Sequence, residues 1–240
     1  MNYKDSKNIY LAVLDFDDTL INGQSQKMFI KFLFRENYIS FLKYCIIMIW
    51  FTFFKLGFSI NINGIFKYAL STICNNKVGK IDYLFDKFFN EICVPKIYKN
   101  SKNLISLLKE KNFYTIIIST AVDPIILRAQ KYFGIDDIIC TKLERFNGVY
   151  TGEILGEPMF AEHKTKTLTS FIESNNLGKS SIYVFADHET DIGILSMVNN
   201  PIATNPTLKL FKYAQDREWS MLYLNSNESF QYFKSNIMFK

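Results

Sequence analysis

Short runs of continuous apolar residues recur along the chain, separated by longer segments of mixed character. Such runs, bounded by polar or turn residues, are typical of strands that are buried on both faces of a parallel sheet. The first run, IYLAVL, lies close to the start of the chain. The pattern predicts buried strands at residues 9–14, 114–118, 138–141, 182–186 and 201–204.

Amphipathic segments with helix-start and helix-stop residues separate the later runs. Residues 101–111 carry apolar side chains at helical spacing, and Asp123-Pro124 opens a helix that Gly134 closes. Asn147-Gly148 lies between two short apolar segments and predicts a β-hairpin. Strands and helices alternate after Pro95, so the predicted fold class is α/β, a three-layer Rossmann-like core with helices on both faces of a parallel sheet. Further helices are predicted at residues 163–177 ending at Gly178, at 191–198, and from Pro206 onward.

The segment between the first two predicted strands has a different character. Residues 23–95 show helical patterns, many aromatic residues and few strand signals. We therefore expect an α/β core made of residues 1–22 and 96–240, into which residues 23–95 are inserted as an all-helical cap.

Within this insertion, residues 38–60 are almost wholly apolar and are interrupted by Lys43 and Lys55. Three interpretations remain open. The stretch is a helix packed inside the cap, a helix lying on a membrane surface, or a membrane-spanning helix that has to accommodate both lysines.

Composition adds an unusually high aromatic fraction of 16% and a net charge of +5. The charge comes mostly from lysines scattered along the chain, which argues against a nucleic-acid surface and favours small anionic substrates or an anionic membrane. The polar start of the chain resembles no signal peptide, so we expect a cytoplasmic protein, with contact to the inner face of the membrane as an open alternative. Four cysteines without close pairing predict free thiols: Cys45, Cys74, Cys93 and Cys140.

Two carboxylates follow the first predicted strand. Asp15 and Asp17 are two positions apart, so on extended backbone their side chains point the same way. Open α/β sheets bind ligands at the carboxyl ends of their strands. Carboxylates gathered there repel one another unless a cation or a shared proton intervenes, and Mg²⁺ is typically held by such groups together with phosphate oxygens. The alternative is that these acidic residues simply end a strand and begin a turn.

Four more polar residues border predicted core elements. Ser119 follows one strand, Lys164 stands near the start of a helix, and Asp187 and Asp191 follow another strand. The carboxyl ends of neighbouring strands would bring Ser119 and Asp187 to the same edge as Asp15 and Asp17. Carboxylates, a hydroxyl and a lysine are the groups that phosphoryl transfer through an aspartyl-phosphate requires.

The order of DFDDTL, IIIS, HKTKTL and ADHETD resembles that of the haloacid dehalogenase superfamily of phosphohydrolases. More narrowly, it resembles the phosphoserine-phosphatase-like branch, subfamily IB, in which a helical C1 cap follows the first motif. The tract KLERFNGVYTGEI and the later PIATNPTLKLF, with Trp219 soon after, also look like that branch. The resemblance covers nearly the whole chain. It implies hydrolysis of a phosphorylated substrate through an aspartyl-phosphate, with Mg²⁺ as cofactor.

The resemblance also implies roles for individual residues. Asp15 would be the nucleophile, Asp17 the general acid and base, Ser119 a ligand of the phosphoryl oxygens, and Lys164 the cation that neutralises them. Mg²⁺ would be held by Asp15, the backbone carbonyl of Asp17, Asp187 and, directly or through water, Asp191. The candidate substrate-binding residues are Thr19, which would also orient the motif, Gln24 and Thr120.

Two departures from the branch concern the substrate. Phosphoserine phosphatases carry an acidic residue nine positions after the nucleophile, where this chain has the neutral Gln24, and glycines where it has Thr120 and Ala121. Both departures argue against phosphoserine. The insertion also resembles the cap of phosphatidylglycerophosphatase C-like members, which act on a lipid phosphate. A phosphatase for small phosphomonoesters, a membrane-surface phosphatase for lipid phosphates, a phosphoserine phosphatase and a binding protein without turnover remain the alternatives.

Overall fold

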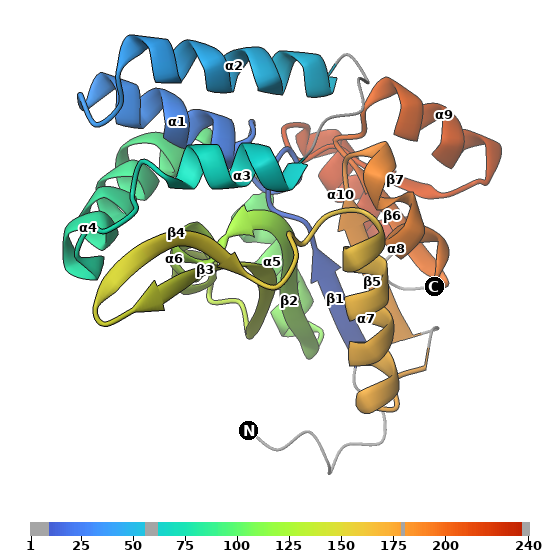
Figure 1. Cartoon of the computed structure of the whole chain (residues 1–240). Coiled ribbons are helices and arrows are strands. Elements are labelled where there is room, and N and C mark those ends of the chain that lie inside the picture. Colours follow the sequence, from blue (N-terminus) through green and yellow to red (C-terminus); the bar gives the residue numbers. More distant parts are fainter. Residues whose placement is uncertain (1–9, 56–61, 179–180, 237–240) are drawn as a thin grey trace.

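The sheet that the apolar runs predict is present in the computed structural model, which describes residues 10–55, 62–178 and 181–236 (Figure 1). Its strand order is β4-β3-β2-β1-β5-β6-β7, and every neighbouring pair is parallel except β3 and β4. This confirms the predicted α/β class. The strands are β1 (Tyr10–Leu14), β2 (Phe113–Val122), β3 (Asp137–Phe146), β4 (Val149–Leu155), β5 (Ile182–Ala186), β6 (Asn200–Thr204) and β7 (Ser220–Leu222).

Helices cover both faces of the sheet, as predicted. Alternate residues of β1 enter different apolar clusters: Ala12 and Leu14 face one, and Leu11 and Val13 face the other. The first cluster includes side chains from α5 (Ser101–Glu110), α6 (Asp123–Phe133) and α10 (Asn227–Asn236). The second includes side chains from α7 (Glu162–Ser174), α8 (Ile192–Ser196) and α9 (Leu208–Asp216). The central strand is therefore buried on both sides.

Several predicted boundaries are wrong. The second strand runs on to Val122, because Val122 pairs with Thr141 of β3 beyond a register shift at Thr120 and Ala121. α7 ends at Ser174 instead of residue 177, because Asn176 adopts a left-handed φ of 51°. α9 begins at Leu208, because the Thr207 side chain caps it. β7 and α10 were not predicted, and Ile9 lies outside the described residues.

The predicted hairpin joins β3 and β4. Asn147 and Gly148 both have positive φ, 48° and 75°, as a two-residue type I′ turn requires. The segment predicted as a separate short strand at 138–141 belongs to the same long strand, β3.

Helices fill the segment between β1 and β2. Rings from α1 and α4 form its aromatic centre: Phe29 stacks on Phe85 with centroids 4.4 Å apart and meets Phe88 edge-on at 5.0 Å. The division of the chain into a core and a cap at residues 23–95 stays a prediction. The elements of this helical insertion are α1 (Ser25–Arg35), α2 (Phe41–Lys55), α3 (Ile62–Leu70), α4 (Val78–Phe88), a π-helix (Phe89–Cys93) and a 3₁₀ helix (Val94–Lys96).

The loop between α3 and α4 is bonded to the β3–β4 hairpin. The backbone N–H of Asn75 donates to the Tyr150 carbonyl, and the Tyr150 N–H donates to Asn76. The N–H of Val78 donates to the Gly148 carbonyl. The buried Tyr150 hydroxyl also donates to Asp82 of α4 at 2.7 Å. The helical insertion is thereby attached to the outer edge of the sheet.

Of the apolar stretch at residues 38–60, residues 41–55 form α2, and residues 56–60 lie outside the described residues. α2 lies at the outer side of the molecule (Figure 1). Ile47 is fully buried, whereas Phe41 and Leu42 are each 69% exposed and Ile49 is 51% exposed. Among the described residues, no helix is long and apolar enough to cross a membrane. The interpretation of this stretch as a helix packed inside the cap therefore fits only one side of α2.

Candidate active site

Three buried carboxylates meet at the carboxyl ends of β1 and β5. Asp15 follows β1, and its N–H donates to the Phe185 carbonyl of the neighbouring strand at 2.8 Å. Asp187 follows β5, and Asp191 ends the short 3₁₀ turn after it. One oxygen from each carboxylate lies within 4.8 Å of the others. The sheet topology thus brings Asp15 together with two carboxylates that lie more than 170 positions later in the sequence.

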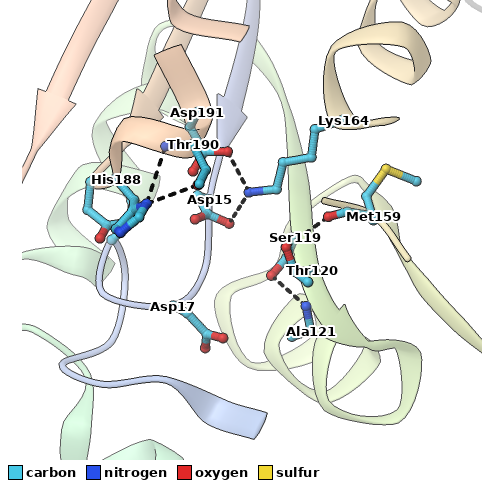
Figure 2. Close-up of polar contacts among 12 residues, drawn as sticks. Asp15, Asp17, Ser119, Thr120, Ala121, Met159, Lys164, His188, Thr190 and Asp191 are labelled. Carbon is cyan, nitrogen blue, oxygen red and sulfur yellow. Dashed lines mark hydrogen bonds and ion pairs between the residues drawn. The ribbon is translucent and has the colours of Figure 1, made fainter. Parts of the chain in front are cut away.

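Lys164 reaches this cluster from α7. Its Nζ lies 3.1 Å from Oδ1 of Asp15 and 2.9 Å from Oδ1 of Asp191, and Figure 2 shows both contacts. Burial opposes the charge of the amine, but the two carboxylates outweigh it, so the pKa of Lys164 is raised. The lysine is therefore a buried, paired cation directly beside Asp15.

Burial also perturbs the carboxylates. It raises the pKa of Asp15 to about 6, against the opposing charge of Lys164. Burial and repulsion from Asp15 raise the pKa of Asp187 well above its usual range. One lysine among three carboxylates leaves excess negative charge in a site of low dielectric, which favours a bound cation.

Asp17 lies in the same pocket but faces away from the cluster (Figure 2). Its carboxylate accepts hydrogen bonds from the Ser25 backbone N–H at 2.9 Å and from the Ser25 hydroxyl at 3.0 Å. Burial raises the pKa of Asp17 to about 7, although the bonds from Ser25 act in the opposite direction. Asp17 therefore exchanges its proton near neutral pH, and it does so at the N-terminus of α1.

Ser119 and Thr120 lie within β2, at the point where its register with β3 shifts. The Ser119 hydroxyl accepts a hydrogen bond from the Ala121 N–H at 3.2 Å. The Thr120 hydroxyl donates to the Met159 carbonyl at 2.8 Å. Both residues line the pocket that holds Asp15 and Lys164. The irregular part of the strand therefore forms one wall of this pocket.

The pocket, called the catalytic pocket below because it holds the candidate catalytic residues, measures about 700 Å³ including its open mouth, and it brings together nearly all of the predicted site residues. Gln24 lines it, at the N-cap position of α1. Thr19 does not line it: this residue is fully buried, and its hydroxyl donates to Asp187 Oδ1 at 3.1 Å. A substrate-binding role for Thr19 does not fit that placement, whereas the orienting role does.

The family model of the haloacid dehalogenase-like hydrolases matches residues 12–196. The chain belongs to this family. A histidinol-phosphatase from Neisseria meningitidis serogroup C (strain 8013) is 26% identical over 218 residues, which are 88% of this chain and 97% of the relative. The comparisons support the predicted phosphatase, an enzyme that hydrolyses phosphomonoesters.

Solved structures confirm the fold of this hydrolase. A protein of unknown function from Bordetella pertussis Tohama I superimposes with a TM-score of 0.80 at 21% identity, covering 90% of this chain and 98% of that one. A phospho-aspartyl intermediate analogue of phosphoserine phosphatase gives a TM-score of 0.68 at 15% identity, covering 95% and 99%.

The donor set of this haloacid dehalogenase-like hydrolase suits Mg²⁺. Asp15, Asp187 and Asp191 offer carboxylate oxygens only, the ligand type that this hard cation prefers. Thr19 donates to Asp187 and holds that carboxylate in place. The prediction of a magnesium site therefore fits the residues present.

Sequence reasoning missed four residues near the chemistry. Ser25 follows the N-cap Gln24 as the first residue of α1, and nothing in the pattern ties it to Asp17. Gln26, Phe51 and Phe160 also line the catalytic pocket. His188 lines the pocket as well, and its Nδ1 accepts from the Thr190 N–H at 3.2 Å.

Proposed function

We propose that this hydrolase is a Mg²⁺-dependent phosphatase that works through an aspartyl-phosphate on Asp15. The placement of Asp15 carries the proposal, because its Oδ1 lies 3.1 Å from the buried amine of Lys164, in one pocket with Asp17 and Ser119. A nucleophile, a cation and an acid–base group are the main requirements of phosphoryl transfer by this route.

In the first step, a carboxylate oxygen of Asp15 attacks phosphorus, the bond between phosphorus and the ester oxygen breaks, and Asp17 gives its proton to the departing oxygen. In the second step, water attacks the phosphorus of the aspartyl-phosphate, Asp17 takes a proton from that water, and the bond to Asp15 breaks to release phosphate. A pKa of about 7 allows Asp17 to serve in both directions.

The other residues stabilise the charge that develops on the phosphoryl oxygens. Lys164 neutralises it, and the hydroxyl of Ser119 binds one oxygen. Gln24 and Thr120 contact the substrate from the rim of the pocket. When bound, Mg²⁺ supplies further charge neutralisation and is held by Asp15, Asp187, Asp191 and the backbone carbonyl of Asp17.

A second candidate is a phosphatase that acts on lipid phosphates at a membrane surface. The observation that favours it is the exposed apolar side of α2, with Phe41, Leu42, Ile49 and Phe53. Flotation with anionic liposomes separates the two candidates. A chain that stays with the soluble fraction while it hydrolyses soluble phosphomonoesters is not a membrane-surface enzyme.

The central experiment compares Asp15→Asn with Asp216→Asn, a matched change on the exposed end of α9. We expect Asp15→Asn to reduce the release of phosphate from p-nitrophenyl phosphate by more than about 1000-fold. Asp216→Asn should retain wild-type turnover. Chelation of Mg²⁺ should stop turnover by the wild-type enzyme. Mass spectrometry of the acid-quenched wild-type enzyme should find the added phosphoryl group on Asp15. Appreciable turnover by Asp15→Asn, or a phosphoryl group on another residue, contradicts the proposal.

A further inference from the structure

A second pocket adjoins the catalytic one and has the opposite character. It lies between the helical insertion and β2, and it measures about 890 Å³ including its open mouth. That is within the range of pockets that hold small molecules. Apolar side chains make up most of its wall, among them Phe29, Leu33, Leu70, Ile73 and Ile125. The stacked rings of Phe29 and Phe85 form part of its wall.

The two pockets share part of their lining. Gln26, Phe51, Thr120 and Phe160 line both the catalytic pocket and the apolar pocket. A phosphoryl group on the Asp15 side therefore has the apolar pocket directly beside it. The part of a substrate that fits this space is the alcohol to which the phosphoryl group is attached.

The wall of the apolar pocket is unsuited to a charged group. Among the described residues, none with an ionisable side chain lines it. Its two polar side chains are bonded to the protein, because Gln26 donates to the Thr120 carbonyl at 2.7 Å and Thr120 donates to the Met159 carbonyl. Burying an ammonium or carboxylate there without a partner is strongly unfavourable. An uncharged hydrocarbon body, aliphatic or aromatic, loses no hydrogen bonds and gains from leaving water.

We propose that the substrate is a phosphomonoester whose alcohol carries an uncharged apolar body, and that this body occupies the apolar pocket. The inference rests on the proposed phosphatase function and names its substrate class. It separates this chain from enzymes for amino-alcohol phosphates, since phosphoserine and histidinol phosphate both carry an ammonium group.

A homologous series of soluble n-alkyl phosphates, from ethyl to octyl, tests the inference with the Mg²⁺-loaded enzyme. Each methylene that enters the pocket should raise kcat/KM by about four-fold until the pocket is full. 6-Aminohexyl phosphate is the charged counterpart of hexyl phosphate, and we expect its kcat/KM to be at least about ten-fold lower. Phosphoserine and histidinol phosphate should also be poorer substrates than hexyl phosphate.

Two variants test whether the dependence of kcat/KM on chain length arises in the apolar pocket. Ala69 and Leu70 both line it, so Ala69→Phe should fill it and lower the ratio of kcat/KM for octyl to ethyl phosphate by about ten-fold or more. Leu70→Ala should enlarge it and move the optimum to longer chains. Ile49→Phe, on the exposed side of α2, is the control that keeps the wild-type ratio. Thermal melting confirms that each variant is folded.

The outcomes are distinct. A flat response to chain length, or equal turnover of hexyl and 6-aminohexyl phosphate, overturns the inference while the phosphatase function stands. A chain-length preference that both pocket variants leave unchanged overturns the assignment to this pocket. Absence of turnover for every ester in the presence of Mg²⁺ overturns the proposed function, and the inference with it.

Discussion

The bond between Tyr150 and Asp82 offers a direct measure of how firmly the helical insertion is attached to the sheet. The Tyr150 side chain is fully buried on β4, and its hydroxyl donates to Asp82 Oδ1 at 2.7 Å and accepts from Arg145 at 3.1 Å. Tyr150→Phe removes the hydroxyl without opening a cavity larger than one atom. Arg145 keeps its 2.8 Å ion pair with Asp123, so the main loss is the donor to Asp82.

Hydrogen bonds to charged groups contribute about 1.5–3 kcal/mol, so we expect Tyr150→Phe to lower the free energy of unfolding by about 2 kcal/mol. At this chain length that corresponds to a fall in Tm of about 4–8 °C. Tyr83→Phe is the matched control, because Tyr83 lies next to Asp82 on α4 and is 67% exposed. Its effect should stay within about 0.5 kcal/mol.

Urea unfolding followed by tryptophan fluorescence is a suitable assay. Trp50 lies in the helical insertion and Trp219 lies next to β7, so single-tryptophan versions report on the two parts separately. In an Asp82→Asn background, Tyr150→Phe should cost clearly less than in the wild type, since the shared bond is already weakened. A loss below about 0.5 kcal/mol, or equal losses in both backgrounds, would refute the reasoning.

The remaining predictions concern the active site and the packing of α7 against α8. Mg²⁺ at 100 times its Kd should stabilise the wild-type protein by about 2.7 kcal/mol, measured by calorimetry. Asp187→Asn should remove most of this stabilisation by Mg²⁺. A variant that Mg²⁺ stabilises as much as the wild type contradicts the metal site. Because Asp17 must carry a proton for the first step, kcat should fall as pH rises through about 7. Ser25→Ala removes a bond that lowers the pKa of Asp17, so a pH–rate profile of that variant should show this fall at higher pH, and a shift to lower pH would be inconsistent. A Cβ at Gly193 would lie 2.5 Å from Thr165 Oγ1. Gly193→Ala should therefore lower the free energy of unfolding, measured by chemical denaturation, by about 1–3 kcal/mol. An unchanged free energy of unfolding would mean that α7 and α8 adjust freely.

The parts of the fold that sequence predicts well are those with strong local signals. β5 matches its prediction at both ends, because a continuous apolar run is bounded by polar residues on each side. Positions directly after strands predict that Asp15 and Asp187 meet at one sheet edge, and the order of the motifs singles out Lys164. The contact between Ser25 and Asp17 escaped, because it depends on how the loop after β1 returns to the start of α1. The apolar pocket escaped for a similar reason: within residues 38–60, periodicity alone does not tell which side chains, such as Phe51, turn inward.

The attachment of the α3–α4 loop to the β3–β4 hairpin also bears on solubility. β4 is the outer strand of the sheet, and an uncovered outer strand presents N–H and C=O groups that can pair with another molecule. Asn75, Asn76 and Val78 occupy several of those groups on Tyr150 and Gly148. At the opposite edge, β7 has only three residues and offers little backbone for pairing. Changes that release the helical insertion should therefore promote edge-to-edge aggregation as well as lower stability, so the insertion protects the sheet in addition to lining the candidate active site.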